Sequence, residues 1–186
     1  MPQAKIALIS RDDLLSNSTV IYEYDEILEA ISSIALSLNE AYQGKKVSLI
    51  PVMTGVLPFA GHLIPKLEFD LELDYYHASR YQNNKGGNTI RLIYEPQEEK
   101  IKDQAVLLLD DILDEGHTLA YITDKLNKQG ASSVETAVLF DKIIDKPKPL
   151  LASYVGLKVP NIYVYGFGLD FNGIGRNMAH LYAYKN

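Results

Sequence analysis

The sequence predicts an α/β fold with a central, mainly parallel sheet flanked by helices. Short, nearly continuous apolar runs at 47–52, 105–109 and 134–140 are typical of strands buried on both faces. Segments with helical apolar spacing precede the first run, at 25–41, and separate the last two, at 118–129. This alternation of strands and helices indicates a parallel sheet with right-handed crossovers.

Length and composition indicate one globular domain, residues 1–186, with a net charge of −6. An acidic chain offers no basic stripe for a duplex, so we expect no nucleic-acid partner. The absence of cysteine excludes disulfides, thiolate metal ligands and a cysteine nucleophile. Because no run of about 18 apolar residues and no signal-peptide pattern occur, we expect no membrane partner and a cytoplasmic location.

The first elements follow from spacing and capping residues. Residues 1–20 leave helix and strand equally open. A helix is predicted from an N-cap at Asp25 to a stop at Gly44, because apolar residues recur at steps of three and four. The run 47–52 then predicts a buried strand, and a second helix is expected to begin near Leu57.

The middle of the chain predicts a two-stranded arm. Apolar alternation over 69–78 favours one strand, and 90–94 favours a short second strand. The polar segment between them contains adjacent glycines and little that can be buried, so a mobile loop is expected over 79–90.

The second half repeats the strand and helix pattern. The run 105–109 is followed by a helix over 118–129 and by the strand 134–140. Residues 154–159 lead to a last predicted strand at 162–167.

Acidic residues gather directly after the central apolar run. Asp110 and Asp111 are adjacent, Asp114 follows, and Gly116 and Thr118 lead into the next helix. Helix capping alone would explain Asp114 or Thr118. Adjacent carboxylates beside a buried strand repel each other and are costly to desolvate, which is typical of functional sites. Since ligands of open α/β sheets bind beyond the carboxyl ends of the strands, we expect a cation and a phosphate here.

Two acidic-cluster folds fit this pattern less well. A response-regulator receiver has its paired aspartates near its N-terminus, and a haloacid-dehalogenase-type phosphatase requires Asp-x-Asp. The stretch AVLLLDDILDEGHTL instead resembles the signature with which type I phosphoribosyltransferases bind phosphoribosyl pyrophosphate (PRPP).

Further segments extend the resemblance over residues 45–178. In order, they are PVMTGVLPFAGHL, DYYHASRY, VLLLDDILDEGHTL, VLFDKI and VYGFGLDFNGIGRN, and they are similar to hypoxanthine-guanine phosphoribosyltransferases. The resemblance implies the type I phosphoribosyltransferase fold, with a small hood from residues 1–20 and 160–186 and a loop, 79–90, that closes over PRPP. It implies purine salvage: a 6-oxopurine such as hypoxanthine or guanine displaces pyrophosphate from PRPP, with Mg²⁺ as cofactor.

The resemblance also implies roles for the acidic residues. Asp110 and Asp111 would take the ribose 2′- and 3′-hydroxyls, directly or through the metal. Asp114 would be the catalytic general base beside purine N7. Asp170, next to the purine site, would be a metal ligand, and oxygen ligation suits Mg²⁺.

Other matched positions would bind the phosphates. The turn of Glu115, Gly116, His117 and Thr118 would offer backbone N–H groups and a hydroxyl to the 5′-phosphate, with the Glu115 side chain pointing away. The remaining nucleotide-binding positions implied by the family are Thr54, Gly55, Arg80, Tyr81 and Arg176, with Thr54 and Gly55 in a pyrophosphate loop and Arg176 as a guanidinium fork for pyrophosphate.

Purine selection is implied for residues after the next strand. The ammonium of Lys142 has only donors, so it would favour a 6-oxo group over the amino group of adenine. Tyr163 would stack on the base, while Ile162 and Val164 would present backbone groups to its edge. A xanthine-preferring enzyme and a non-catalytic PRPP-binding regulator are the alternatives. Relatives suggest a homodimer or homotetramer.

Overall fold

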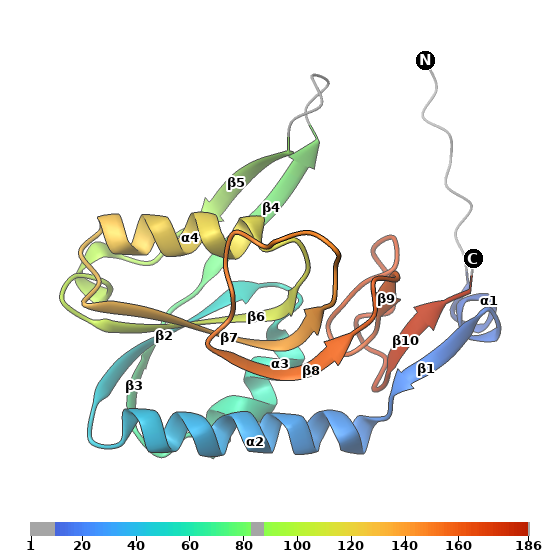
Figure 1. The fold of residues 1–186 in the computed structure, drawn as a ribbon, viewed down its shortest axis with the longest axis horizontal. Helices are drawn as coiled ribbons and strands as arrows, with labels where there is room; N and C mark the ends of the chain where they lie inside the picture. The colour runs from blue at the N-terminus through green and yellow to red at the C-terminus, as the bar shows by residue number, and fades with distance from the viewer. Residues whose placement is uncertain (1–9, 83–87, 186) are drawn as a thin grey trace.

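A computed structural model describes residues 10–82 and 88–185; for 79–82, 88 and 89 it describes the backbone alone. A seven-stranded sheet forms the centre of the molecule, with helices on both of its faces (Figure 1). The predicted fold class is therefore confirmed. In the described part of the chain, no helix combines the length and apolar character that a membrane crossing requires.

The sheet is parallel except at one edge. β4 and β5 pair antiparallel and form the predicted arm, while every other pairing is parallel. In spatial order the strands are β5 (Asn88–Tyr94), β4 (Tyr76–Gln82), β2 (Lys46–Met53), β6 (Ala105–Leu113), β7 (Ser133–Lys142) and β8 (Tyr154–Val159), with β3 (Asp70–Leu73) beside the start of β2.

Two apolar cores lie on opposite faces of β6. Leu107 and Leu109 belong to the core beneath α2 (Tyr24–Tyr42) and α3 (Leu57–Leu63). Val106 and Leu108 belong to the core beneath α4 (His117–Lys128). Successive strand side chains point to opposite faces, so this alternation continues along the strand to its polar end. Two short 3₁₀ helices, η1 (Ile64–Lys66) and η2 (Glu98–Lys100), complete the connections.

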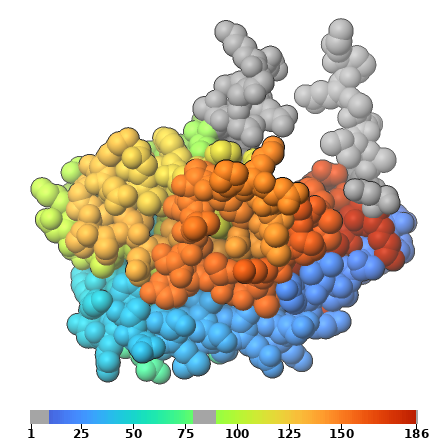
Figure 2. All heavy atoms as spheres, in the orientation of Figure 1, coloured from blue at the N-terminus to red at the C-terminus, as the bar shows by residue number. Residues whose placement is uncertain are grey.

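Helix α2 begins slightly earlier than predicted. Its N-cap is Glu23, whose side chain accepts a hydrogen bond from the backbone of Glu26, while the Glu26 carboxylate accepts one from Glu23 N–H. This reciprocal capping box places Asp25 inside the first turn, where its charge faces the positive end of the helix dipole. Figure 2 shows α2 along the lower edge of the molecule.

The predicted strand 69–78 is wrong as a single element. It is divided into β3 and β4, which pair with the first and last parts of β2 respectively. Between them the Asp74 N–H donates to Leu49 O at 3.2 Å, and the Asp74 side chain is buried. The predicted loop also starts too early, since β4 reaches Gln82 and β5 starts at Asn88. Residues 83–87 lie outside the described residues.

A second, three-stranded sheet joins the two ends of the chain. Its order is β1 (Ser18–Tyr22), β10 (Leu181–Tyr184) and β9 (Val164–Tyr165), and α1 (Arg11–Ser16) precedes it. Leu14, Tyr165 and Met178 form its small core. The strand predicted over 162–167 is therefore wrong in length, and it adds to this sheet rather than to the central one. Residues 1–9 of the expected hood lie outside the described residues.

Candidate active site

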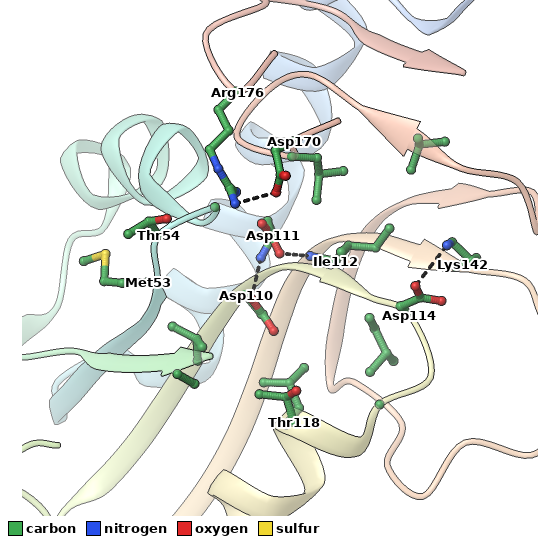
Figure 3. A pocket seen from close by; sticks show the side chains of 18 of the residues that line it. Met53, Thr54, Asp110, Asp111, Ile112, Asp114, Thr118, Lys142, Asp170 and Arg176 are labelled. Carbon is green, nitrogen blue, oxygen red and sulfur yellow. Dashed lines mark hydrogen bonds and ion pairs between the residues drawn. The ribbon is translucent and has the colours of Figure 1, made fainter. Parts of the chain in front are cut away.

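A cavity of about 720 Å³ opens where β2, β6 and β7 end and the small sheet begins (Figure 3). The ends of β2, β6 and β7 converge on it, together with part of β4, the turn before α4 and the segment around β9. Of the expected site residues, it is lined by Thr54, Gly55, Asp110, Asp111, Asp114, Gly116, Thr118, Lys142, Tyr163, Val164, Asp170 and Arg176.

Other expected residues do not line the cavity. The side chains of Glu115 and His117 are exposed, and Ile162 is 41% exposed. The side chains of Arg80 and Tyr81 lie outside the described residues. Because the side chain of Glu115 does not line the cavity, only the backbone at this position can face an anion there.

His77 also lines the cavity, although its sequence position gave no sign of a site residue. It lies on β4 opposite Met53, and the preceding pair is Tyr76 and Val52. The strand 69–78 was not expected to break and to pair again with the end of β2. Only that second pairing brings His77 to the carboxyl end of the sheet.

The two adjacent aspartates lie within β6, which runs four residues further than predicted. They point to opposite faces, Asp111 toward Arg176 and Asp110 toward Thr118 (Figure 3). Asp110 Oδ1 accepts the Asp111 N–H at 3.0 Å, and Asp111 Oδ1 accepts the Ile112 N–H at 2.8 Å. The two carboxylates therefore serve different halves of the cavity.

Asp111 fits against a loop that has no room for a side chain. A Cβ on Gly55 would lie 1.7 Å from Asp111 Oδ2, so only glycine allows this approach. Burial raises the pKa of the Asp111 carboxyl, while its hydrogen bonds and the nearby Arg176 guanidinium oppose that rise. The peptide bond between Met53 and Thr54, just before this glycine, is cis.

Arg176 joins this loop to the chain beyond β9. Its Nη1 donates to Gly168 O at 2.6 Å, and its Nη2 contacts the Asp170 carboxylate. Gly168 has a φ of +99°, and a Cβ there would lie 1.9 Å from Gly55 O. Two glycine backbones thus meet, with one guanidinium beside both and beside two carboxylates. We call Gly55, Asp111, Gly168, Asp170 and Arg176 the glycine–arginine cradle.

The opposite half of the cavity is formed by the start of α4. Gly116 is the N-cap, with a φ of +80° that favours glycine, and Thr118 lies in the first turn. Backbone N–H groups at the start of a helix and the positive end of its dipole favour an anion at this position. We call residues 115–118 the anion turn.

Asp114 and Lys142 form an ion pair in a further part of the cavity, where β6 and β7 end. Their Oδ2 and Nζ atoms are 3.0 Å apart, and the side chains are 40% and 12% exposed. Tyr163 lies nearby; its hydroxyl donates to Asp170 O at 3.0 Å, and its ring meets Phe171 edge-on. These contacts fix the Tyr163 ring, which is 52% exposed. An acid, a donor and an aromatic surface together suit a planar heterocycle.

The oxygen ligands of the cavity fit Mg²⁺ only if a substrate contributes too. Asp110, Asp111 and Asp170 line one cavity, yet within the described ranges no three His, Cys, Asp or Glu side chains form a metal-binding group. Mg²⁺ is commonly bound by one or two carboxylates together with substrate phosphates and waters. The carboxylates present are compatible with that mode of binding.

Comparisons with known proteins agree with this geometry. Residues 19–172 match the model of the phosphoribosyl transferase domain. A hypoxanthine-guanine phosphoribosyltransferase from Streptococcus mutans is 31% identical over 166 residues, 89% of this chain and 92% of that protein. A hypoxanthine phosphoribosyltransferase structure from Staphylococcus aureus has a TM-score of 0.82 at 28% identity, over 90% of this chain and 91% of that one.

A solved hypoxanthine-guanine-xanthine phosphoribosyltransferase is also similar, with a TM-score of 0.76 and 30% identity over 90% of this chain and 97% of that one. Because the family model and these relatives span most of the chain, the protein belongs to the phosphoribosyltransferase family.

Proposed function

We propose that the protein is a purine-salvage enzyme that transfers the 5-phosphoribosyl group of PRPP to hypoxanthine or guanine. The products are IMP or GMP and pyrophosphate. The observation that supports this most directly is the Asp114–Lys142 pair, which shares one cavity with the anion turn and the glycine–arginine cradle. One cavity thus has a place for a base, a 5′-phosphate and a pyrophosphate.

In this proposal Asp114 is the general base. Its carboxylate accepts the proton of purine N7 as the ring attacks the anomeric carbon of PRPP. Lys142 donates to the 6-oxo group, and the Tyr163 ring covers one face of the base. Ile162 and Val164 contribute backbone groups at the purine edge. Because Lys142 has donors only, adenine would face it with a second donor and would be rejected.

The sugar and the phosphates occupy the other two sides. The anion turn holds the 5′-phosphate, and Asp110 and Asp111 hold the ribose hydroxyls. Arg176, Thr54 and Gly55 receive the pyrophosphate. Asp170 and these carboxylates would hold Mg²⁺, which would supply positive charge to neutralise the pyrophosphate as it leaves. Arg80 and Tyr81 lie at the end of β4, in the arm that is proposed to close over PRPP, and they are assigned to PRPP by resemblance alone.

The larger organisation is part of the same proposal. Residues 1–186 form one domain, and the small sheet, with the rest of 1–20 and 160–186, is the hood over the base. We also propose a homodimer or homotetramer that works in the cytoplasm. A mass measurement in solution tests the assembly, and a monomer at micromolar concentration would contradict it.

Steady-state rates with fresh PRPP and Mg²⁺ test the function. We expect IMP from hypoxanthine, GMP from guanine and no reaction with adenine. Xanthine is included because one similar solved enzyme is named for it. PRPP binding without turnover of any base would contradict an enzyme and favour a regulator.

Asp114→Asn sharpens this test. We expect kcat to fall by about 100-fold or more, since a positioned general base contributes roughly that much, with PRPP affinity nearly unchanged. Asp124→Asn is the matched control, because Asp124 is an exposed acid on α4 that pairs with Lys128. Equal losses in PRPP affinity and in kcat would contradict the role of base.

A further inference from the structure

A lysine outside the proposed catalytic groups joins the two strand ends that carry Asp114 and Lys142. Lys148 lies in the connection between β7 and β8, and its side chain is only 6% exposed. Its Nζ donates to Leu113 O at 2.7 Å and to Asp141 Oδ1 at 2.5 Å. We propose that Lys148 is a positioning residue that holds the general base and the purine-selecting lysine in their working geometry.

Strand register places Lys148 beside both of these groups. Leu113 and Asp141 are the last paired residues of the β6–β7 ladder. Asp114 follows Leu113 in the chain, and Lys142 follows Asp141. Beyond this last pair, backbone hydrogen bonds no longer fix the distance between the segments that follow β6 and β7. The Lys148 ammonium bonds to both members of the pair, so it holds the strand ends together where the ladder stops.

Charge balance points to the same role. The Asp141 carboxylate is paired with Lys148, and the Asp114 carboxylate is paired with Lys142. Consecutive strand residues point to opposite faces, so Asp141 turns away from Lys142 and toward the β7–β8 connection. Without Lys148, the Asp141 carboxylate, which is 25% exposed, would lose its cation. A partly buried carboxylate without its partner would move toward water and take the end of β7 with it.

The β7–β8 connection has a second anchor, which keeps it in place without the lysine. A Cβ on Gly116 would lie 3.5 Å from Pro149 Cδ and 3.6 Å from Leu150 O, so the connection packs behind the anion turn. Figure 2 shows this orange segment filling the surface between α4 and the small sheet. Loss of the ammonium should therefore loosen the strand ends more than it displaces the whole connection.

The decisive variant is Lys148→Met, which keeps the length of the side chain and removes its charge and donors. We expect kcat/KM for hypoxanthine to fall by about 10-fold, the effect of a charged hydrogen bond worth near 1.4 kcal/mol. The loss should appear in the purine KM and in kcat, while the KM for PRPP changes by less than about threefold. Lys148→Arg, which keeps a cation with several donors, should recover most of the activity.

A control separates positioning from general stability. Lys100→Met removes another partly buried ion pair, since Lys100 lies 3.2 Å from the buried carboxylate of Asp74, and neither residue lines the cavity. Both variants should lower the melting temperature, but Lys100→Met should leave kcat and both KM values unchanged. If Lys148→Met does not fold, Lys148→Gln replaces it, because glutamine keeps a neutral donor. The expected changes in kcat and in the purine KM are in the same direction.

The inference depends on the proposed function, and one assay separates their failures. An inactive wild-type enzyme would overturn the function. The positioning role would be overturned if the wild type is active and a folded Lys148→Met or Lys148→Gln variant keeps the wild-type purine KM and kcat. The positioning role would also be overturned if Lys148→Met and Lys100→Met lowered kcat/KM for hypoxanthine to the same extent.

Discussion

The two sides of the β6 strand end build their parts of the cavity in different ways. The anion turn, residues 115–118, lies directly after β6, and its glycine N-cap and first helical turn are consecutive residues. The glycine–arginine cradle, in contrast, brings together three separate parts of the chain. Asp110 faces the first side and Asp111 the second (Figure 3).

The anion turn and the cradle differ in how well they tolerate substitutions. An anion turn depends on N–H groups and a helix dipole, so it changes little when a neighbouring side chain shifts. The cradle depends on contacts such as the fit of Asp111 against Gly55, where even one methyl group has no room. We therefore expect substitutions in the cradle to have larger effects than those in the turn.

The largest effect is expected for Gly55→Ala. The new Cβ would clash with Asp111 Oδ2 and come within 3.0 Å of Arg176, so both groups must move. We expect kcat/KM to fall by about 100-fold, the effect of misplacing reacting groups by about 1 Å. Kinetics at saturating and limiting PRPP measure the loss.

Gly61→Ala is the matched control, since nothing lies within 4 Å of a Cβ at Gly61 on α3. Alanine also has the better helix propensity, by roughly 0.5–1 kcal/mol, so the control should be slightly more stable and fully active. A fully active Gly55→Ala enzyme would show that the cradle tolerates change as well as the turn does.

A smaller effect is expected on the other side, from Thr118→Val. Valine keeps the shape of threonine and removes the hydroxyl offered to the 5′-phosphate, while the backbone N–H groups of the turn remain. We expect the KM for PRPP to rise by about 10-fold, because a hydrogen bond to a charged group contributes roughly 1.5 kcal/mol. The purine KM should change little. A loss larger than that of Gly55→Ala would reverse the ranking of the two sides.

The smallest effect on catalysis is expected away from both sides, at Asp74. Burial raises the pKa of this carboxyl, but hydrogen bonds from Tyr75, Lys100 and Tyr94 outweigh burial and hold the pKa below its usual value. Because the pKa of Asp74 is lower in the folded state than in the unfolded state, the ionised carboxyl stabilises the folded protein at pH values above the unfolded-state pKa, near 4. This stabilisation is lost as the pH falls toward the folded-state pKa.

Asp74→Asn should therefore flatten the dependence of the unfolding free energy on pH below about pH 4. At neutral pH we expect lower stability and unchanged kcat and KM, because Asp74 does not line the cavity. Urea unfolding at several pH values measures the first effect. A changed purine KM would show that the cavity responds to remote charges and not only to the residues that line it.

Family resemblance predicted most of the site, but not how its parts are arranged. The twelve expected residues that line the cavity were recognised from short motifs, each of which matches within a few consecutive residues. Residues that act through pairing between distant strands were not recognised. His77 reaches the cavity because β4 pairs with the end of β2, and Lys148 reaches β6 from the β7–β8 connection.

The sequence by itself determined the α/β class, the alternation of strands and helices in the central sheet, and the acidic turn with a glycine just before the next helix. These are local properties, because apolar spacing, capping and turn residues act within a few positions of one another. Only the tertiary structure decided that adjacent aspartates face opposite sides and that two glycine backbones meet beside Arg176. Those outcomes depend on strand length, register and close packing between segments far apart in the chain, where a shift of one residue reverses the direction of every side chain.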